Sequence, residues 1–96
     1  MFGIISDTTF MKIVIARRTV TSENCKIGKT IRRGKDWKWG DEDHKNGVPG
    51  TGVITECQSS NWAIVEWFNG IKLNYRIGAH NSYDLFFAGN EKSSNA

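Results

Sequence analysis

Short runs of β-branched and aromatic residues recur along the chain from about residue 26, separated by turns rich in glycine, asparagine and serine. Runs of roughly four to eight such residues between turn signals are typical of β-strands, and no helical repeat is sustained. The pattern therefore predicts an all-β domain with strands over residues 26–33, 51–57, 62–67, 71–77 and 83–88. Five short strands with one long first loop describe a small barrel.

The alternation within these strands predicts which side chains share a face, because successive side chains in a strand point to opposite sides. In the first strand Ile27 and Ile31 are expected on one face, and in the second Ile54 is expected on the face opposite Cys57. The closing strand is expected to place on one side Tyr83, Leu85 and Phe87.

The sequence around Asn69-Gly70 predicts a β-hairpin whose register can be argued. A two-residue loop would oppose Trp67 and Lys72 and would mix apolar with polar groups. A three-residue loop, 68–70, with Gly70 in the left-handed region makes one face apolar. We predict this second register, whose opposed residues are Trp67 with Ile71, Val65 with Leu73, Ala63 with Tyr75 and Glu66 with Lys72.

An earlier run, Phe10 to Val20, is also rich in strand-forming residues, but it lacks clean alternation, and its place in the fold stays open. We divide the chain into an N-terminal extension (1–25), a domain (26–88) and a short polar tail (89–96) that is expected to fray. Neither a secretory signal nor a membrane span is indicated, because Asp7 and Lys12 interrupt the apolar N-terminal residues.

The long loop, 35–50, contains two tryptophans one residue apart, Trp37 and Trp39. A large ring is an effective anchor for a long loop, so at least one of the two is expected in the core, and which one stays open. The functional alternative is an aromatic groove for a partner peptide, because tryptophan, tyrosine and arginine dominate binding hot spots.

The acidic residues around these tryptophans raise the question of a metal loop. A calcium loop of the Asp-x-Asp-x-Asp-Gly type would need an oxygen ligand where Lys45 stands. We therefore predict neither a metal site nor a cofactor.

The same acids are expected to order the loop and to meet a partner. Asp36 and Asp41 are expected to cap loop amides or to pair with arginines, whereas Glu42 and Asp43 are expected to be exposed to a basic partner. Arg76 lies on the outer face in the predicted register, where it can either bind a partner carboxylate or hold the acidic loop.

Composition excludes several functions without naming a partner. Thirteen basic and ten acidic residues give a net charge of +3, which is a mild excess for a nucleic-acid binder. Cys25 and Cys57 are read as two separate thiols, which indicates a cytoplasmic or nuclear protein and argues against zinc. His44 and His80 lie in polar turns without a nucleophile motif, so no enzyme activity is predicted.

The chain resembles the Mind bomb/HERC domain of ubiquitin ligases over about residues 26–88. The resemblance rests on several linked motifs in one order, which a single Trp-x-Trp would not provide. These motifs are Arg33-Gly34, Asp36-Trp37-Lys38-Trp39-Gly40-Asp41 with Asp43, Gly50-Thr51 with Val53, Trp67 before Asn69-Gly70, Tyr75-Arg76 with Gly78, and Tyr83-Asp84-Leu85.

The resemblance implies an SH3-like barrel that recognises substrates for an attached ubiquitin-transfer domain, without catalysis of its own. In Mind bomb proteins, such domains capture the cytoplasmic tails of Notch ligands. For this monomeric domain the expected partner is a protein or peptide, bound through Trp37, Trp39, Glu42, Asp43, Arg76 and Tyr83. Structural roles are expected for Asp36, Asp41, Gly50, Trp67, Gly70, Tyr75, Asp84 and Leu85.

Two further functions remain as alternatives. A small barrel with aromatic rings and the basic strand 26–33 could bind nucleic acid by stacking bases and following phosphates. A cage of three rings beside an acid could read methylated lysine. The acids around the tryptophans disfavour the first, and the second depends on a geometry that no sequence displays.

Overall fold

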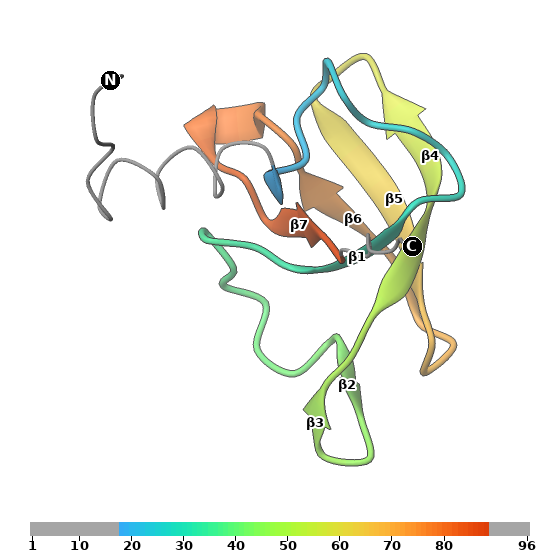
Figure 1. The fold of residues 1–96 in the computed structure, drawn as a ribbon. Helices are drawn as coiled ribbons and strands as arrows, with labels where there is room; N and C mark the ends of the chain where they lie inside the picture. The colour runs from blue at the N-terminus through green and yellow to red at the C-terminus, as the bar shows by residue number, and fades with distance from the viewer. Residues whose placement is uncertain (1–17, 89–96) are drawn as a thin grey trace, which may run out of the picture.

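The computed structural model describes residues 18–88, which form strands and turns with almost no helix (Figure 1). The main sheet is antiparallel, in the order β6-β5-β4-β1-β7. Its strands are β1 (Thr30–Arg33), β4 (Gly52–Gln58), β5 (Trp62–Trp67), β6 (Lys72–Arg76) and β7 (Leu85–Phe87). A small ribbon pairs β2 (His44–Lys45) with β3 (Val48–Pro49), and the 3₁₀ turn η1 (Ala79–Asn81) follows β6. The predicted all-β class is confirmed.

The outermost strands of the main sheet, β6 and β7, meet at one end. Beyond β6, Ile77 forms an isolated bridge with Tyr83, and the Asp84 amide donates a 2.9 Å hydrogen bond to the Arg76 carbonyl. The sheet therefore curls until its first and last strands are tied together. The finer SH3-like description remains a prediction.

The β5–β6 hairpin has the predicted register. Gly70 has a φ of +94°, and its amide donates to the Trp67 carbonyl. The Trp67 amide donates in turn to the Ile71 carbonyl over 2.8 Å. The opposed residues include Ala63 with Tyr75, Val65 with Leu73 and Glu66 with Lys72. The three-residue loop is thus confirmed.

The apolar face of this hairpin is only partly covered. Val65 is fully buried, but its neighbour Leu73 is 38% exposed and Ile71 is 43% exposed. Glu66 and Lys72 are opposed, but they are not among the three ion pairs found within residues 18–88. The hairpin therefore leaves an uncovered region near its turn.

The first predicted strand begins later than expected. Residues before Thr30 form a turn in which Gly28 has a φ of +93° and donates its amide to the Ile54 carbonyl. Ile27 is 70% exposed, whereas Ile31 is fully buried. The prediction that Ile27 and Ile31 share a face is wrong, because the turn interrupts the alternation between them.

A bulge changes the faces of β4. The β4–β5 register shifts between Ile54 and Glu56, so that Ile54 pairs with Val65 while Cys57 pairs with Ala63. One additional residue in the strand reverses the faces that follow it. Ile54 and Cys57 therefore lie on the same side of the strand, and the prediction that separated them is wrong.

The loop that was predicted over 35–50 contains the β2–β3 ribbon. Asn46 and Gly47, at its turn, have φ values of +57° and +82°. Two consecutive residues with positive φ are typical of the two-residue turns that match the twist of paired strands. The Asn46-Gly47 pair therefore forms a hairpin here. The hairpin was not predicted, because the whole segment has the composition of turns.

The predicted early strand, Phe10 to Val20, lies mostly outside the described residues, as does the tail 89–96. Within the described part, Thr19 bridges Phe86, and the Val20 amide donates to the Leu85 carbonyl over 3.0 Å. Val20 is fully buried. The end of the extension thus covers β7 and belongs to the core. No helix within residues 18–88 is long and apolar enough to span a bilayer.

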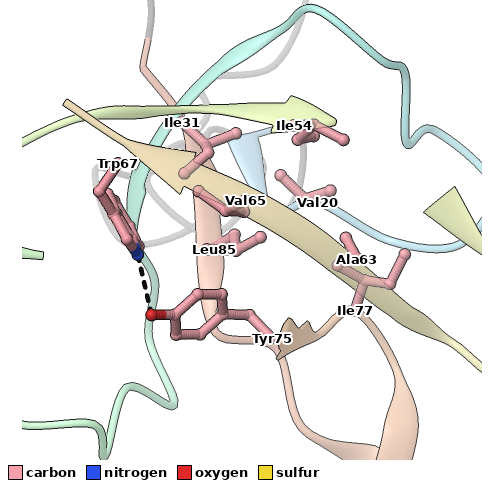
Figure 2. Close-up of a cluster of buried hydrophobic side chains, with 9 residues drawn as sticks. All are labelled: Val20, Ile31, Ile54, Ala63, Val65, Trp67, Tyr75, Ile77 and Leu85. Atoms are coloured by element: carbon pink, nitrogen blue, oxygen red, sulfur yellow. Dashed lines mark hydrogen bonds between the residues drawn. The ribbon is translucent and has the colours of Figure 1, made fainter. Parts of the chain in front are cut away.

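One connected core lies inside the curled sheet (Figure 2). Every strand of the main sheet contributes to it, because alternate residues of each strand point inward. In Figure 2 the indole of Trp67 points to the hydroxyl of Tyr75. The core side chains are Val20, Ile31, Ile54, Ala63, Val65, Trp67, Tyr75, Ile77 and Leu85.

Cys25 and Cys57 form a disulfide, with 6.1 Å between their Cα atoms. The prediction of two separate thiols is therefore wrong. Their 32-residue separation gives no sign of pairing, because the bulge in β4 and the turn after Val20 decide where each side chain points. The predicted cytoplasmic or nuclear location loses the support of free thiols and stays a prediction.

Candidate functional site

The aromatic loop, which we define as residues 34–43, begins against the strand β7. A Cβ atom on Gly34 would lie 2.5 Å from the backbone nitrogen of Leu85, so no larger residue fits without displacing the backbone. Asp36 continues this contact: its amide donates to the Tyr83 carbonyl over 3.0 Å, and its Oδ2 accepts from the Tyr83 amide over 2.8 Å. The loop therefore starts in a fixed position.

Asp36 connects this loop to Tyr83 and Arg76. The hydrogen bond from the Tyr83 amide, aided by Lys35 at 3.1 Å, lowers the pKa of the Asp36 carboxyl. The carbonyl of Asp36 accepts a 2.9 Å bond from Arg76. Asp41, in contrast, is exposed and contributes its carbonyl to the His44 amide. Contacts of the loop thus converge on Asp36.

Trp37 lies half-buried against the core. Its ring is stacked on Tyr75, with 5.3 Å between centroids, and its edge-to-face contact with Trp67 has a centroid distance of 5.7 Å. The Arg33 guanidinium lies 5.1 Å from its ring centroid. The Nε1 of Trp37 donates a hydrogen bond to the Gly40 carbonyl and closes the turn of the loop.

Trp39 is also half-buried and also packs on the core. Its Nε1 donates a 2.9 Å hydrogen bond to Oδ2 of Asp84, and its ring meets Tyr75 edge to face. Arg76 and Lys38 lie 5.5 and 5.0 Å from its ring centroid. Both tryptophans therefore anchor the loop, and both residues stay partly exposed.

Tyr75 connects the ring cluster to the loop. Its hydroxyl accepts a 2.8 Å hydrogen bond from Trp67 and donates one of 2.8 Å to Glu42. Burial, together with the bond to Glu42, raises the pKa of Tyr75 far above its ordinary value. Glu42 was expected to be exposed to a partner. It is half-buried, because its carboxylate accepts the hydrogen bond from the Tyr75 hydroxyl.

Arg76 forms a buried ion pair with Asp84. The guanidinium donates to both carboxylate oxygens, over 2.9 and 2.6 Å, and the Arg76 amide donates to Oδ2 as well. Arg76 is only 7% exposed, and its bond to Asp84 raises its pKa. The register places Arg76 on the face away from Tyr75 as expected, but its side chain is not available at the surface, because the turn after β6 brings Asp84 across this end of the strand. The alternative role, holding the acidic loop, agrees with its bond to Asp36.

Arg33 and Asp43 form a second pair at the other end of the loop. Two bonds of 2.8 Å join the guanidinium to both oxygens of Asp43. Asp43 was expected to be exposed, but it is 1% exposed, because Arg33 and the Gly50 backbone enclose it. A Cβ on Gly50 would lie 3.1 Å from the Asp43 carbonyl, which explains the small residue there.

Asn69 is a structural residue that the sequence did not single out for this role. From the β5–β6 turn, its side-chain nitrogen donates to the carbonyls of Glu42 and His44 over 3.0 and 2.8 Å. Its Oδ1 accepts from the Ile71 amide. The turn composition signalled only a hairpin, so this contact over 25 residues became visible only in the fold.

The surface that remains for a partner, which we name the aromatic loop surface, combines half-exposed rings with lysines. Lys35 lies 5.3 Å from the ring centroid of Tyr83, and Lys38 covers Trp39. Cations over rings are favourable at partly exposed sites. The surface comprises Lys35, Trp37, Lys38, Trp39 and Tyr83.

Three of the four acidic side chains of the loop accept hydrogen bonds within the protein. Within residues 18–88 there is no group of three or more His, Cys, Asp or Glu side chains that could hold a metal ion. Asp36, Glu42 and Asp43 instead accept hydrogen bonds from backbone amides, Tyr75 and Arg33. These three carboxylates therefore help to hold the loop in place.

Comparison with known proteins shows that this sequence is similar to segments of E3 ubiquitin-protein ligases. The family model Mib_herc2 matches residues 28–89. The E3 ubiquitin-protein ligase HERC2 of Homo sapiens is 45% identical over 64 residues, covering 66% of this chain and 1% of that protein. The E3 ubiquitin-protein ligase MIB2 of Gallus gallus is 36% identical over 69 residues, covering 67% of the chain and 7% of that protein. The E3 ubiquitin-protein ligase Ufd4 of Drosophila melanogaster is 36% identical over 61 residues, covering 64% and 2%.

Proposed function

Because this chain belongs to the Mib_herc2 family, we propose that it acts as the substrate-recognition domain of an E3 ubiquitin ligase. Relatives named as ligases support the ligase context. The chain spans only a few per cent of their length, so ubiquitin transfer is assigned to other parts of such proteins. Both cysteines are bonded to each other, which leaves neither thiol available for a thioester with ubiquitin. We therefore infer binding without catalysis.

The observation that carries this proposal is the preorganised aromatic loop surface. Two arginine–aspartate pairs hold the loop, while Trp37, Trp39 and Tyr83 are each partly exposed. A partner that packs on rings already held in position does not have to order them. Aromatic side chains in fixed positions are typical binding hot spots.

The internal contacts narrow the expected set of binding residues. Arg76 and Asp43 are buried in ion pairs, and Glu42 holds Tyr75, so these three support the site from within. The binding residues that we propose are the aromatic loop surface. Its two lysines favour a peptide with an acidic residue beside an apolar one, because oppositely charged surfaces attract.

A methyl-lysine cage is disfavoured by the same contacts. One face of Trp37 is stacked on Tyr75, and the Arg33 guanidinium also lies over its ring. Trp39 likewise has Arg76 and Lys38 over its ring. A methylated lysine would have to displace the protein's own cations, whereas an open cage receives it directly.

Nucleic acid is a second candidate, supported by the lysines beside rings. Asp36 and the exposed Asp41 lie in the same loop and would repel a nucleic acid, which carries a charge at every phosphate, more than a peptide with one acidic residue. Binding to an oligonucleotide should weaken steeply as salt rises. Peptide binding that rests on ring packing should depend on salt far less.

The proposal is tested with peptides of matched length in which one acidic and one aliphatic position are varied. We expect the 96-residue chain to bind some of them, measured by fluorescence polarisation, and the Lys35→Glu/Lys38→Glu variant to lose this binding. The Lys26→Glu/Lys29→Glu variant is the matched control, because it changes the charge equally at exposed positions elsewhere. Equal binding by both variants, or a preference for a single-stranded oligonucleotide, would contradict the proposal.

A further inference from the structure

The strand β6 is a terminal strand of the main sheet, and one part of its outer edge is open. It pairs with β5 on one side only, and within residues 18–88 no strand lies along its other side. Its far end is closed, because the amide and carbonyl of Arg76 bond to Asp84. Lys72, Leu73 and Asn74, nearer the turn, are all exposed.

The hairpin register determines which backbone groups face this open edge. The Ile71 carbonyl accepts from β5, so residues 71, 73 and 75 direct their hydrogen-bonding groups toward β5. Residues 72, 74 and 76 direct theirs outward, in agreement with the outward bonds of Arg76 to Asp84. The open edge therefore presents the N–H and C=O groups of Lys72 and Asn74.

A hollow of about 410 Å³ lies beside this edge, lined by Ile64, Lys72, Leu73 and Asn74. Leu73 and Ile71 are among the large apolar side chains that the fold leaves exposed. Unpaired edge groups next to apolar surface are the combination that an added strand uses, because its backbone pairs with the edge while its side chains fill the hollow.

The charge at the edge distinguishes between occupants. Lys72 lies at the end of the open segment nearest the turn and takes part in none of the ion pairs within residues 18–88. A second copy of this chain would bring a second Lys72 to the same short edge, and an edge lysine disfavours such self-pairing. A strand that carries an acidic residue opposite Lys72 would instead gain a favourable cross-strand pair.

We propose that the open edge of β6 accepts an extended segment of a partner protein as an additional β-strand. The segment has an acidic residue opposite Lys72, followed by two apolar residues. The first lies opposite Leu73, and the second lies opposite Asn74, on the face of the sheet that Ile64 shares. This surface is separate from the aromatic loop surface, since neither set of residues includes a member of the other. The domain then has two places at which a peptide can be held.

The experiment uses blocked peptides in which glutamate and two apolar residues occupy the central positions in either direction, tested against the 96-residue chain. We expect binders whose addition shifts the NMR amide signals of Lys72 and Asn74. In an added strand, only every second residue directs its N–H toward the edge of β6. Methylating the backbone nitrogens of these residues should abolish binding, and methylating those of the residues between them should not. Binding that tolerates both patterns, or an array without binders, would overturn the proposal.

A charge exchange separates a specific strand pair from general attraction. Lys72→Glu should lower the affinity for the glutamate peptide by about three- to tenfold. A peptide with lysine in place of glutamate should bind this variant with the original affinity. Lys26→Glu, an exposed control with the same change in charge, should have no effect. Lys35→Glu/Lys38→Glu should also retain this binding, which keeps the test independent of the aromatic loop surface. Dimerisation of the free chain through residues 72–74 would contradict a peptide occupant.

Discussion

Two arginine–aspartate pairs hold the aromatic loop, Arg33 with Asp43 and Arg76 with Asp84, and they differ in their access to water. Arg76 and Asp84 have side chains that are 9% and 0% exposed, whereas Arg33 is 34% exposed beside a fully buried Asp43. Asp84 also accepts bonds from the Trp39 indole and the Arg76 amide. The inner pair is therefore part of a network, while the outer pair has a partner that water can reach.

This difference matters more than the similar bond lengths of 2.6 and 2.8 Å. A buried charge that loses its partner cannot be rehydrated without disturbing the fold, whereas a partly exposed arginine can turn to solvent. The two pairs should thus have unequal effects on stability, although both hold the same loop.

Asp84→Ala should have the largest effect. It leaves the Arg76 guanidinium buried and removes the acceptor of the Trp39 indole, so we expect a loss of about 3–5 kcal/mol in the free energy of unfolding. Urea unfolding followed by tryptophan fluorescence measures it. Asp41→Ala, an exposed acid in the same loop, is the control, with an expected change within about 0.5 kcal/mol. An equal cost for both would refute the assignment of a network to the inner pair.

Loss of the disulfide should come next and should leave the loop intact. Cys25→Ser/Cys57→Ser opens a crosslink between residues 32 apart, which is expected to lower the unfolding free energy by about 2–4 kcal/mol. Thermal unfolding measures this loss. Because the crosslink lies outside the aromatic loop, the sharp tryptophan bands of the near-ultraviolet circular dichroism should stay unchanged once the broad band of the disulfide itself is allowed for. A change there would mean that the crosslink and the ring cluster are coupled.

Asp43→Ala should cost less than Asp84→Ala, about 1–3 kcal/mol, because Arg33 can turn to water. It should alter the tryptophan spectrum as well, since Arg33 lies over the ring of Trp37. Urea unfolding and fluorescence emission measure the two effects on one sample. If Asp43→Ala proved as costly as Asp84→Ala, access to water would not be what separates the pairs.

Tyr75→Phe tests the residue between the two pairs, because the Tyr75 ring contacts both Trp37, which Arg33 covers, and Trp39, which bonds to Asp84. It removes the acceptor of the Trp67 indole and the donor to Glu42, for an expected loss of about 1–2 kcal/mol. Tyr83→Phe is the matched control, because the bonds of Tyr83 to Asp36 are made by its backbone. Unfolding in guanidinium chloride compares the stabilities of the two variants, and equal losses would contradict the central role of Tyr75.

The same tyrosine should govern stability at alkaline pH. Its pKa is raised in the folded chain, so its contribution is complete below the ordinary value of 10.0 and is lost as pH rises above it, because the unfolded chain then releases a proton that the folded chain retains. Unfolding free energies measured across this range should decline in the wild type. The decline should be reduced in Tyr75→Phe and kept in Tyr83→Phe.

The smallest effect should occur at acid pH through Asp36. Its pKa is lowered by the Tyr83 amide, so its contribution is present above the ordinary value of 3.8 and is lost as pH falls below it. Asp36→Asn should reduce this acid dependence of thermal stability. An unchanged acid profile would mean that the hydrogen bond does not favour the charged form.

Local signals predicted the elements whose causes are local. The Asn69-Gly70 turn and the alternation around it were sufficient for the hairpin register, because both depend on neighbours within about a dozen residues. The pairing of the two cysteines was missed for the opposite reason: it depends on a bulge and a turn that have no clear mark in the sequence.

The sequence singled out residues that the structure places around the aromatic loop, but not how they are arranged there. Trp37, Trp39 and Tyr83 are half-exposed around the loop, whereas Asp43 and Arg76, expected at the surface, are buried. The sequence identifies groups that can bond, but it does not state which group reaches which. Asp43 meets Arg33 across 10 residues, and Trp39 meets Asp84 across 45.

The sequence by itself thus determined the all-β class, the hairpin and the family, because strand alternation, turn chemistry and ordered motifs are written along the chain. Only the tertiary structure decided which charges are buried, that both tryptophans anchor one loop, and that part of β6 keeps an open edge. These features depend on contacts between distant segments, where packing and desolvation, rather than local preference, select one arrangement.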